Sequence, residues 1–335
     1  MAGPPATNPC IAGGWGAGTR LSLARLIQLS LERKLAASYS GLVDGVIVVD
    51  KPEGLTSHDV VNRMRRLANS RKVGHLGTLD PMATGVLPLV LGRATRLAQF
   101  FSAAEKTYDA RIQFGWATDT YDREGSPVSQ PVTPNFSLAD LEAVLERFRG
   151  TTLQTPPPFS AKKIAGTPAY RLARKHIAVE LEPVEIRVFA LHLSEFDGTT
   201  ARICLRCSAG TYLRGIAHDV GQQMGCGAFL TALRRTVAGE FAEDQAFTLE
   251  ALGELARAGS LDQALIPAAS VLPEIPNATV DAVTAVEIRH GKDFRLSPFV
   301  DRSGTKYVKA LSPEGDLIAI GEVRLPNLYH PVLVL

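Results

Sequence analysis

Strand-like and helix-like segments alternate irregularly along most of this chain, and that irregularity limits the folds it can adopt. Residues 107–116 alternate between apolar side chains, beginning with Tyr108, and mostly polar ones, which is typical of a strand with one buried face. Other segments carry helical spacing, but helices and strands do not follow one another in a regular βαβ rhythm. We therefore expect an α+β fold, with a mixed, largely antiparallel sheet flanked by helices.

Several other elements can be assigned to particular residues. Ser57 is expected to cap a helix that runs to about Asn69 and carries Val60, Val61 and Met64 on its apolar stripe. Further helices are expected at residues 94–101 and 138–148, and another has Arg214 in its first turn and runs to about Met224. Further strands are expected at residues 45–50, 185–195 and 202–207.

The length of the chain predicts more than one domain. At 335 residues it exceeds the usual limit of a single hydrophobic core. A linker with Pro267, Pro273 and Pro276 precedes a final segment, in which residues 306–311 and 317–323 flank a turn and predict a hairpin. We expect a main domain at residues 41–270 and a small β-rich domain at residues 275–335.

Residues 1–40 are expected to form a disordered N-terminal extension. They begin with a stretch rich in Gly, Pro and Ala, and the remainder carries Arg20, Arg25, Arg33 and Lys34 against the single acid Glu32. Such an Arg-rich, acid-poor start also suits an organellar transit peptide, and a start codon assigned too far upstream is a further alternative.

One carboxylate has an unusual setting. Asp80 is the only acid between Asp59 and Glu105, an interval that holds seven basic residues, and it lies on a loop bounded by Gly74 and Gly85. Hard-cation sites recruit several oxygen ligands, so we expect no metal here. A lone carboxylate among positive charges suits a nucleophile or a general base, which must be ionised. An ordinary Asp-Pro turn is the alternative that this pattern leaves open.

Two basic segments flank this loop in the sequence. The first runs from Arg63 to Lys72, and the second, residues 155–179, contains five basic residues and no acid. Either segment alone could be a solvated helix face, but together they favour a nucleic-acid partner. No run of eighteen apolar residues occurs, so no membrane span is expected. The four cysteines are too few and too badly spaced for a disulfide scaffold, which suits a cytoplasmic protein.

Five segments follow one another in an order that carries a resemblance. They are Val49–Gly54, Gly74–Gly85, Lys106–Tyr108, Gly210–Arg214 and Leu233–Arg235. Together they resemble the motifs of bacterial tRNA pseudouridine synthases of the TruB type, and the second resembles the active-site motif. The resemblance is strong from about residue 45 to residue 265, weaker from residue 275 onward and absent before residue 41.

The resemblance implies a reaction and a partner. A uridine in the T-loop of tRNA, at position 55, would be isomerised to pseudouridine by base flipping and exchange of a C–N for a C–C glycosidic bond. The partner would be the T-arm stem-loop, the enzyme a monomer without a cofactor, and the C-terminal domain PUA-like. Asp80 is implied as the catalytic residue. Attack at C1′, addition at C6 and proton abstraction from the ribose all remain open.

The resemblance also implies residues that act beside Asp80. Tyr108 would stack on the flipped uracil, although its strand pattern equally suits a core tyrosine. Arg214 would pair with Asp80; it lies in the first turn of a helix, where a cation opposes the macrodipole and usually needs an anionic partner.

Four further substrate-binding residues come from the same resemblance. Tyr212 matches a second pocket tyrosine, and Leu233 matches a substrate-contacting leucine, for which core packing is a close alternative. His75 would fill the gap that the flipped bases leave. Lys51 would either shape the loop or contact a phosphate.

Some features depart from this pattern or offer alternatives. Phe159 stands where the family usually has tyrosine, and Lys175 and His176 stand where a glycine is common. Asp119, Asp122 and Glu124 faintly resemble a calcium loop, but their spacing is wrong and we interpret them as a solvated turn. A non-catalytic RNA-binding or tRNA-folding factor is the rival function. A small-molecule enzyme fits the basic segments less well.

Overall fold

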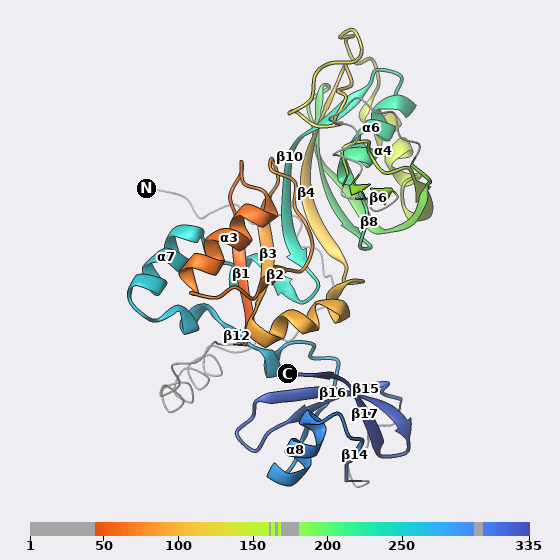
Figure 1. The fold of residues 1–335 in the computed structure, drawn as a ribbon. Coiled ribbons are helices and arrows are strands. Elements are labelled where there is room, and N and C mark those ends of the chain that lie inside the picture. Colours follow the sequence, from red (N-terminus) through yellow and green to blue (C-terminus); the bar gives the residue numbers. More distant parts are fainter. Residues whose placement is uncertain (1–43, 161, 165–166, 169–180, 298–303) are drawn as a thin grey trace, which may run out of the picture.

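The computed structural model describes residues 44–160, 162–164, 167–168, 181–297 and 304–335 (Figure 1). The expected N-terminal extension lies outside these residues, as do Lys175, His176 and part of the second basic segment. A ten-stranded mixed sheet is followed in sequence by a five-stranded sheet, with helices beside both (Figure 1). The expected α+β fold is confirmed.

The large sheet is mostly antiparallel. Its main strands are β1 (Gly45–Lys51), β3 (Thr84–Leu91), β4 (Lys106–Phe114), β5 (Gly150–Gln154), β8 (Val184–Phe196), β9 (Thr200–Cys207), β10 (Ala228–Ala238) and β12 (Ile266–Pro267). They lie in the order β12–β1–β3–β10–β4–β9–β8–β5, and along this path only β3 and β10 pair in parallel. Two short strands, β2 (Val73–His75) and β11 (Phe241–Ala242), pair with β3 and β10. Strands β6 (Lys163–Ile164) and β7 (Thr167–Pro168) form a separate pair.

Strand β4 has the expected two faces. Tyr108, Ala110, Ile112 and Phe114 are buried, whereas Arg111 is exposed. The strand lies between β9 and β10, so its inward side chains pack into the centre of the sheet rather than at an edge. A buried residue on β4 therefore has neighbours from two other strands, which positions it tightly.

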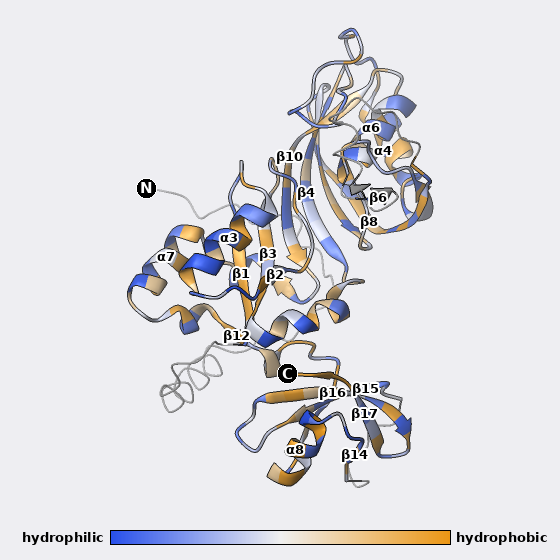
Figure 2. Ribbon diagram, in the orientation of Figure 1, coloured by the Kyte–Doolittle hydropathy of each residue, from blue (hydrophilic) through white to orange (hydrophobic). Residues whose placement is uncertain are grey.

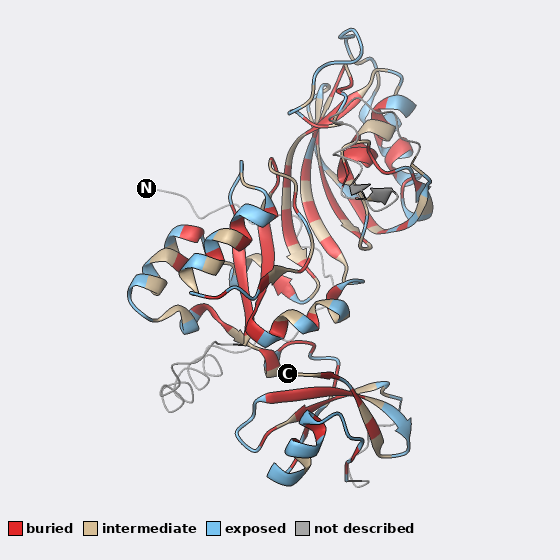
Figure 3. Ribbon diagram, viewed as in Figure 1, coloured by how far each residue is buried: buried red, intermediate tan, exposed pale blue. Residues whose placement is uncertain are grey.

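Helices cover the sheet at two places (Figure 1). Helices α3 (Ser57–Leu67) and α7 (Leu249–Arg257) pack beside β1, and α4 (Leu138–Glu146) and α6 (Leu213–Gln223) pack beside β8 and β10. Burial and hydropathy agree, because β1 and β3 are apolar and buried while α3 and α7 turn polar faces outward (Figures 2 and 3). The segment expected as a helix at residues 94–101 is a 3₁₀ helix, Gly92–Phe101. Shorter 3₁₀ turns span Glu243–Gln245, Leu261–Ala264 and Ala268–Ser270.

The expected cap of α3 is wrong by one residue. Thr56 is the N-cap, and it forms a capping box with Asp59. Ser57 instead turns inward, where its hydroxyl accepts from the Leu79 amide at 2.8 Å and lies 3.0 Å from the Leu79 carbonyl, to which it donates. The serine that resembles a cap thus links α3 to the loop that carries Asp80.

The C-terminal part is a small β-rich, PUA-like domain. Its strands are β13 (Asn277–Thr279), β14 (Phe294–Arg295), β15 (Tyr307–Leu311), β16 (Leu317–Leu325) and β17 (Leu328–Val334), with helix α8 (Ala282–Arg289) beside them. The predicted hairpin is confirmed, since β15 and β16 pair in antiparallel fashion.

The two parts share an apolar core. Leu317, Ile320 and Leu333 of the small domain pack in one buried cluster with Val46 and Val48 of β1. A further buried cluster, which includes Val280, Ile288 and Tyr329, lies within the small domain, so this domain has a core of its own beside the shared one. The boundary near residue 270 stays a prediction. None of the helices in the described part of the chain is long and apolar enough to cross a membrane.

Candidate active site

The loop that carries Asp80 connects β2 to β3, and buried side chains from other elements hold its backbone. Lys51, at the end of β1, is fully buried. Its ammonium group donates to the carbonyl oxygens of Pro52 at 2.9 Å, Pro81 at 3.1 Å and Ala83 at 2.6 Å. Burial lowers the pKa of Lys51 to about 8. Of the two roles expected for Lys51, this position supports loop shaping, because the side chain does not reach the surface.

Arg235 holds the other end of the same loop. Its guanidinium is buried and donates to the carbonyl oxygens of Gly77 at 3.0 Å, Thr78 at 3.4 Å and Val86 at 2.7 Å. Gly85 lies against the Arg235 backbone so closely that a Cβ there would stand 2.2 Å from its carbonyl oxygen. In the sequence Arg235 stands out only as the last residue of the Leu233–Arg235 motif, which implies no role for it.

Asp80 and Arg214 form an ion pair at this loop. Arg214 Nε lies 2.8 Å from Asp80 Oδ2, and Nη2 donates to Oδ1 at 3.3 Å. The arginine side chain is 5% exposed and the aspartate side chain is 35% exposed. The pair therefore has an inner cation and an outer anion, with the carboxylate accessible from solvent.

Three other groups hold the Arg214 guanidinium. Nη1 donates to the Thr120 carbonyl at 3.0 Å, and Nη2 donates to the Phe159 carbonyl at 2.9 Å. A second carboxylate, on Asp122, lies 3.6 Å from Nη1 and is buried. Because Arg and carboxylate groups have planar, complementary geometry, these contacts fix the plane of the guanidinium as well as its position.

The interpretation of Asp119, Asp122 and Glu124 as a solvated turn is wrong for Asp122. Its carboxylate accepts from the Thr120 hydroxyl at 2.6 Å and from the Glu124 amide at 3.0 Å, and it faces Arg214. Polar residues before a glycine are typical of an exposed turn. The local sequence does not reveal that Arg214, which is distant in the chain, faces Asp122.

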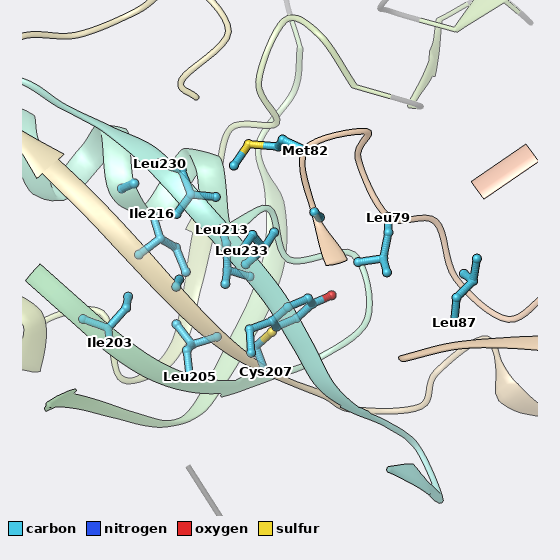
Figure 4. Close-up of a cluster of buried hydrophobic side chains, with 14 of the residues drawn as sticks. Leu79, Met82, Leu87, Ile203, Leu205, Cys207, Leu213, Ile216, Leu230 and Leu233 are labelled. Carbon is cyan, nitrogen blue, oxygen red and sulfur yellow. The ribbon is translucent and has the colours of Figure 1, made fainter. Parts of the chain in front are cut away.

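Tyr108 lies in the core near this loop. It is 7% exposed, and it stands opposite Arg235 in the register of β4 and β10. Burial raises the pKa of its phenol above the usual value, so the hydroxyl carries a proton at neutral pH. Leu233 is 8% exposed and belongs to the same buried cluster, in which Leu213 and the loop residues Leu79 and Met82 are also found (Figure 4).

Tyr212 and His75, the other two residues expected at the site, lie at the ends of secondary-structure elements. Tyr212 is the N-cap residue of α6, and its backbone exchanges two hydrogen bonds with the Gln154 side chain, at 2.9 and 2.8 Å. His75 is half-buried at the end of β2, where Nδ1 accepts from the Gly77 amide at 3.3 Å. Burial lowers the pKa of His75, so its ring is neutral at neutral pH.

A cleft of about 230 Å³ opens beside the loop. Met82 of the loop, Thr84 at the start of β3 and Leu233 of β10 form one part of its wall. The remaining lining residues are mostly charged: Glu53, Asp109, Arg111, Arg123, Arg202, Ala232 and Arg234. On α3, Arg63 and Arg66 are exposed. Basic side chains thus occur both in the cleft and on a neighbouring helix.

Comparisons with known proteins identify the family of this chain. Residues 65–213 match the TruB family pseudouridylate synthase N-terminal domain, and residues 214–273 match the tRNA pseudouridylate synthase B C-terminal domain. The chain is 57% identical to tRNA pseudouridine synthase B of Solibacter usitatus, over 88% of this chain and 100% of that one. It is 41% identical to tRNA pseudouridine synthase B of Pseudomonas fluorescens, over 84% and 92%.

A solved structure has a similar fold. The fold is similar to that in a crystal structure of a Cbf5–Nop10–Gar1 complex, with a TM-score of 0.64, 27% identity, and coverage of 84% of this chain and 79% of that one. Family models that cover most of the chain and a relative with 57% identity over nearly all of its length lead to one conclusion. The chain belongs to the TruB family of pseudouridylate synthases.

Proposed function

We propose that this pseudouridine synthase isomerises uridine 55 in the T-loop of tRNA, with Asp80 as the nucleophile or base. The observation that carries the proposal is the ion pair between Asp80 and Arg214, in which both carboxylate oxygens face the guanidinium while the carboxylate stays partly exposed. An enzyme that forms a bond to the sugar or base, or removes a sugar proton, needs such an oriented anion.

The reaction exchanges one bond for another within the same nucleotide. The C1′–N1 bond of uridine breaks, the base turns and C1′ bonds to C5. The proton on C5 leaves to solvent and N1 takes up a proton, so the product is an isomer of the substrate. No electrons are gained or lost, so the proposal includes no cofactor. Attack at C1′, addition at C6 and abstraction of a ribose proton would all use the same Asp80 carboxylate.

The surroundings of Asp80 support a flipped base. Removing a base from a folded loop costs a few kcal/mol, and stacking against an aromatic ring can offset about 1–3 kcal/mol of that. We propose that Tyr108, and Tyr212 from the start of α6, contact the flipped uracil. Leu233 would pack on its edge, and His75 would occupy space that the base leaves in the RNA.

The partner in this proposal is the T-arm stem-loop of tRNA, bound by a cytoplasmic monomer. Arg63 and Arg66 on α3 are exposed and could contact its backbone phosphates. A non-catalytic RNA-binding factor would not benefit from a carboxylate beside a polyanionic ligand. Asp80 therefore favours catalysis over binding alone.

The test is release of tritium from tRNA labelled at C5 of uridine, which reports loss of the C5 hydrogen directly. The wild-type protein should release tritium from a transcript with uridine 55, and a transcript with cytidine at that position should retain its label. Asp80→Asn preserves the size of the side chain and removes the anion, so it should bind tRNA normally without turnover. Turnover by Asp80→Asn close to the wild-type rate would contradict the proposal.

A further inference from the structure

One turn near the active site has an unusual backbone. Tyr121 has a φ angle of +65°, in the left-handed region that residues other than glycine rarely adopt. Its two neighbours in sequence are both partners of Arg214, because Thr120 offers its carbonyl oxygen and Asp122 its carboxylate. The conformation of Tyr121 therefore determines how these two groups are presented to the guanidinium.

The Tyr121 side chain stacks on helix α6. Its ring lies 3.8 Å from the His218 ring, centroid to centroid, with 13° between the planes. His218 follows Arg214 by four residues on α6, so the two side chains lie on one face of the helix, one turn apart. The helix thus holds the turn at two points, through the Arg214 contacts and through the ring stack.

The chemistry of His218 agrees with a stacking role. Burial lowers the pKa of its imidazole, so the ring is uncharged at neutral pH. Its Nδ1 atom is buried, and no described residue forms a hydrogen bond with it. His218 therefore offers Tyr121 the face of an uncharged ring.

The rest of the turn is built for close packing. Gly125 lies so near Thr120 that a Cβ on it would stand 2.3 Å from the Thr120 hydroxyl. The Leu230 amide donates to the Tyr121 carbonyl at 3.0 Å, and the Thr118 hydroxyl donates to the Asp122 carbonyl at 2.7 Å. The Tyr121 ring ties the centre of the turn to α6 by side-chain stacking.

We infer that Tyr121 and His218 are positioning residues for catalysis: their stack keeps Tyr121 left-handed, and this aims the Thr120 carbonyl and the Asp122 carboxylate at Arg214. Arg214 in turn orients Asp80. Without the stack, Tyr121 relaxes to a negative φ angle, and the guanidinium loses two of the groups that fix its plane. The inference rests on the proposed role of Asp80 and Arg214.

The first test compares two substitutions at His218. His218→Ala removes the ring and should lower the single-turnover rate at saturating tRNA by roughly tenfold or more, because small displacements at a reacting centre have large effects on rate. The dissociation constant for tRNA should stay within about twofold of the wild-type value, since neither ring carries a charge that would attract RNA phosphates. His218→Phe keeps a flat ring and should restore most of the rate.

The second test separates the backbone of Tyr121 from its ring. Tyr121→Gly removes the ring but tolerates the left-handed conformation, whereas Tyr121→Ala removes the ring and disfavours that conformation. The glycine variant should therefore react faster than the alanine variant. This comparison remains informative even if His218→Ala folds poorly, because it does not depend on that variant.

A control addresses general loss of stability. Phe136 and Phe196 form another stacked pair, 5.5 Å apart and 16° from parallel, just before α4 and at the end of β8. Phe196→Leu should lower the melting temperature and leave the rate unchanged at a temperature where the variant is folded. A wild-type rate for His218→Ala, failure of His218→Phe to restore the rate, or a glycine variant slower than the alanine variant would each overturn the inference. Asp80→Asn, measured alongside, tests the proposed function separately.

Discussion

The ammonium group of Lys51 donates a hydrogen bond to the carbonyl oxygen of Pro81, 3.1 Å away, on the residue that directly follows Asp80. Lys51 belongs to the first strand of the sheet and Pro81 lies thirty residues later, so this contact ties the loop that carries Asp80 to the core. A buried lysine whose donors all go to backbone oxygens acts on the shape of the loop, and substitutions can measure that effect.

Lys51→Met should therefore reduce both stability and turnover. The substitution keeps the length of the side chain but removes the donor from the buried Ala83 carbonyl oxygen, at a cost of about 1–3 kcal/mol, and from two partly buried ones at a lower cost. We expect a lower melting temperature, and a lower single-turnover rate at a temperature where the variant is folded. The dissociation constant for tRNA should change little; a large loss of affinity would indicate that Lys51 meets a phosphate instead.

Lys309 provides a matched comparison, because it is another buried lysine that donates to backbone carbonyls. Its ammonium group bonds to Ala269 at 3.0 Å and Val271 at 2.7 Å, in the linker before the small domain. Lys309→Met should lower the melting temperature in the same way as Lys51→Met. Because Lys309 lies in the small domain, we expect weaker tRNA binding and an unchanged rate at saturating tRNA. Loss of rate without loss of affinity would contradict a binding role for that domain.

Arg214→Lys should lower turnover much more than tRNA affinity. Lysine keeps the positive charge but cannot contact both oxygens of Asp80 while also donating to the Thr120 and Phe159 carbonyls. We expect a loss of rate on the order of a hundredfold, measured by single-turnover tritium release. Equal losses of rate and affinity would show that Arg214 contacts the RNA backbone.

The elements that could be predicted from the sequence are those that depend on residues close together in the chain. The alternation of β4 and the turn between β15 and β16 are local, so periodicity and turn residues were sufficient to place them. The α+β class followed because no regular βαβ rhythm occurs. These predictions needed no knowledge of which strands pair.

The candidate site was predictable only in part. Asp80 stood out by charge, but its pairing with Arg214 spans 134 residues and was expected only from the family resemblance. Three other features depend on segments that meet only in the folded chain. They are the burial of Asp122, the inward orientation of Ser57 and the hydrogen bonds from Arg235 to the loop. Spacing along the sequence does not reveal these contacts, because the local sequence around a polar residue is the same whether a distant arginine or water contacts it.

Tyr108 is the residue for which core and catalytic roles predict different outcomes. Its ring is buried on the inner face of β4, so Tyr108→Leu should cost roughly 1–3 kcal/mol in packing whatever its role in catalysis. The informative variant is Tyr108→Phe, which keeps the ring and removes only the hydroxyl. If the hydroxyl takes part in proton transfer, this variant should melt near the wild-type temperature, bind tRNA normally and turn over slowly. Burial raises the pKa of that hydroxyl, which keeps it protonated and able to donate at neutral pH.

The control for Tyr108 lies on the same face of the same strand. Phe114 is buried six residues further along β4, and Phe114→Leu should lower the melting temperature by an amount similar to that for Tyr108→Leu. Its turnover should stay normal where the protein is folded, because six residues of extended strand, about 20 Å, separate Phe114 from Tyr108. A slow Tyr108→Leu beside an active Phe114→Leu of equal stability would assign the loss to the site. If Tyr108→Phe is fully active and the two leucine variants behave alike, Tyr108 serves the core and another aromatic residue must stack on the uracil.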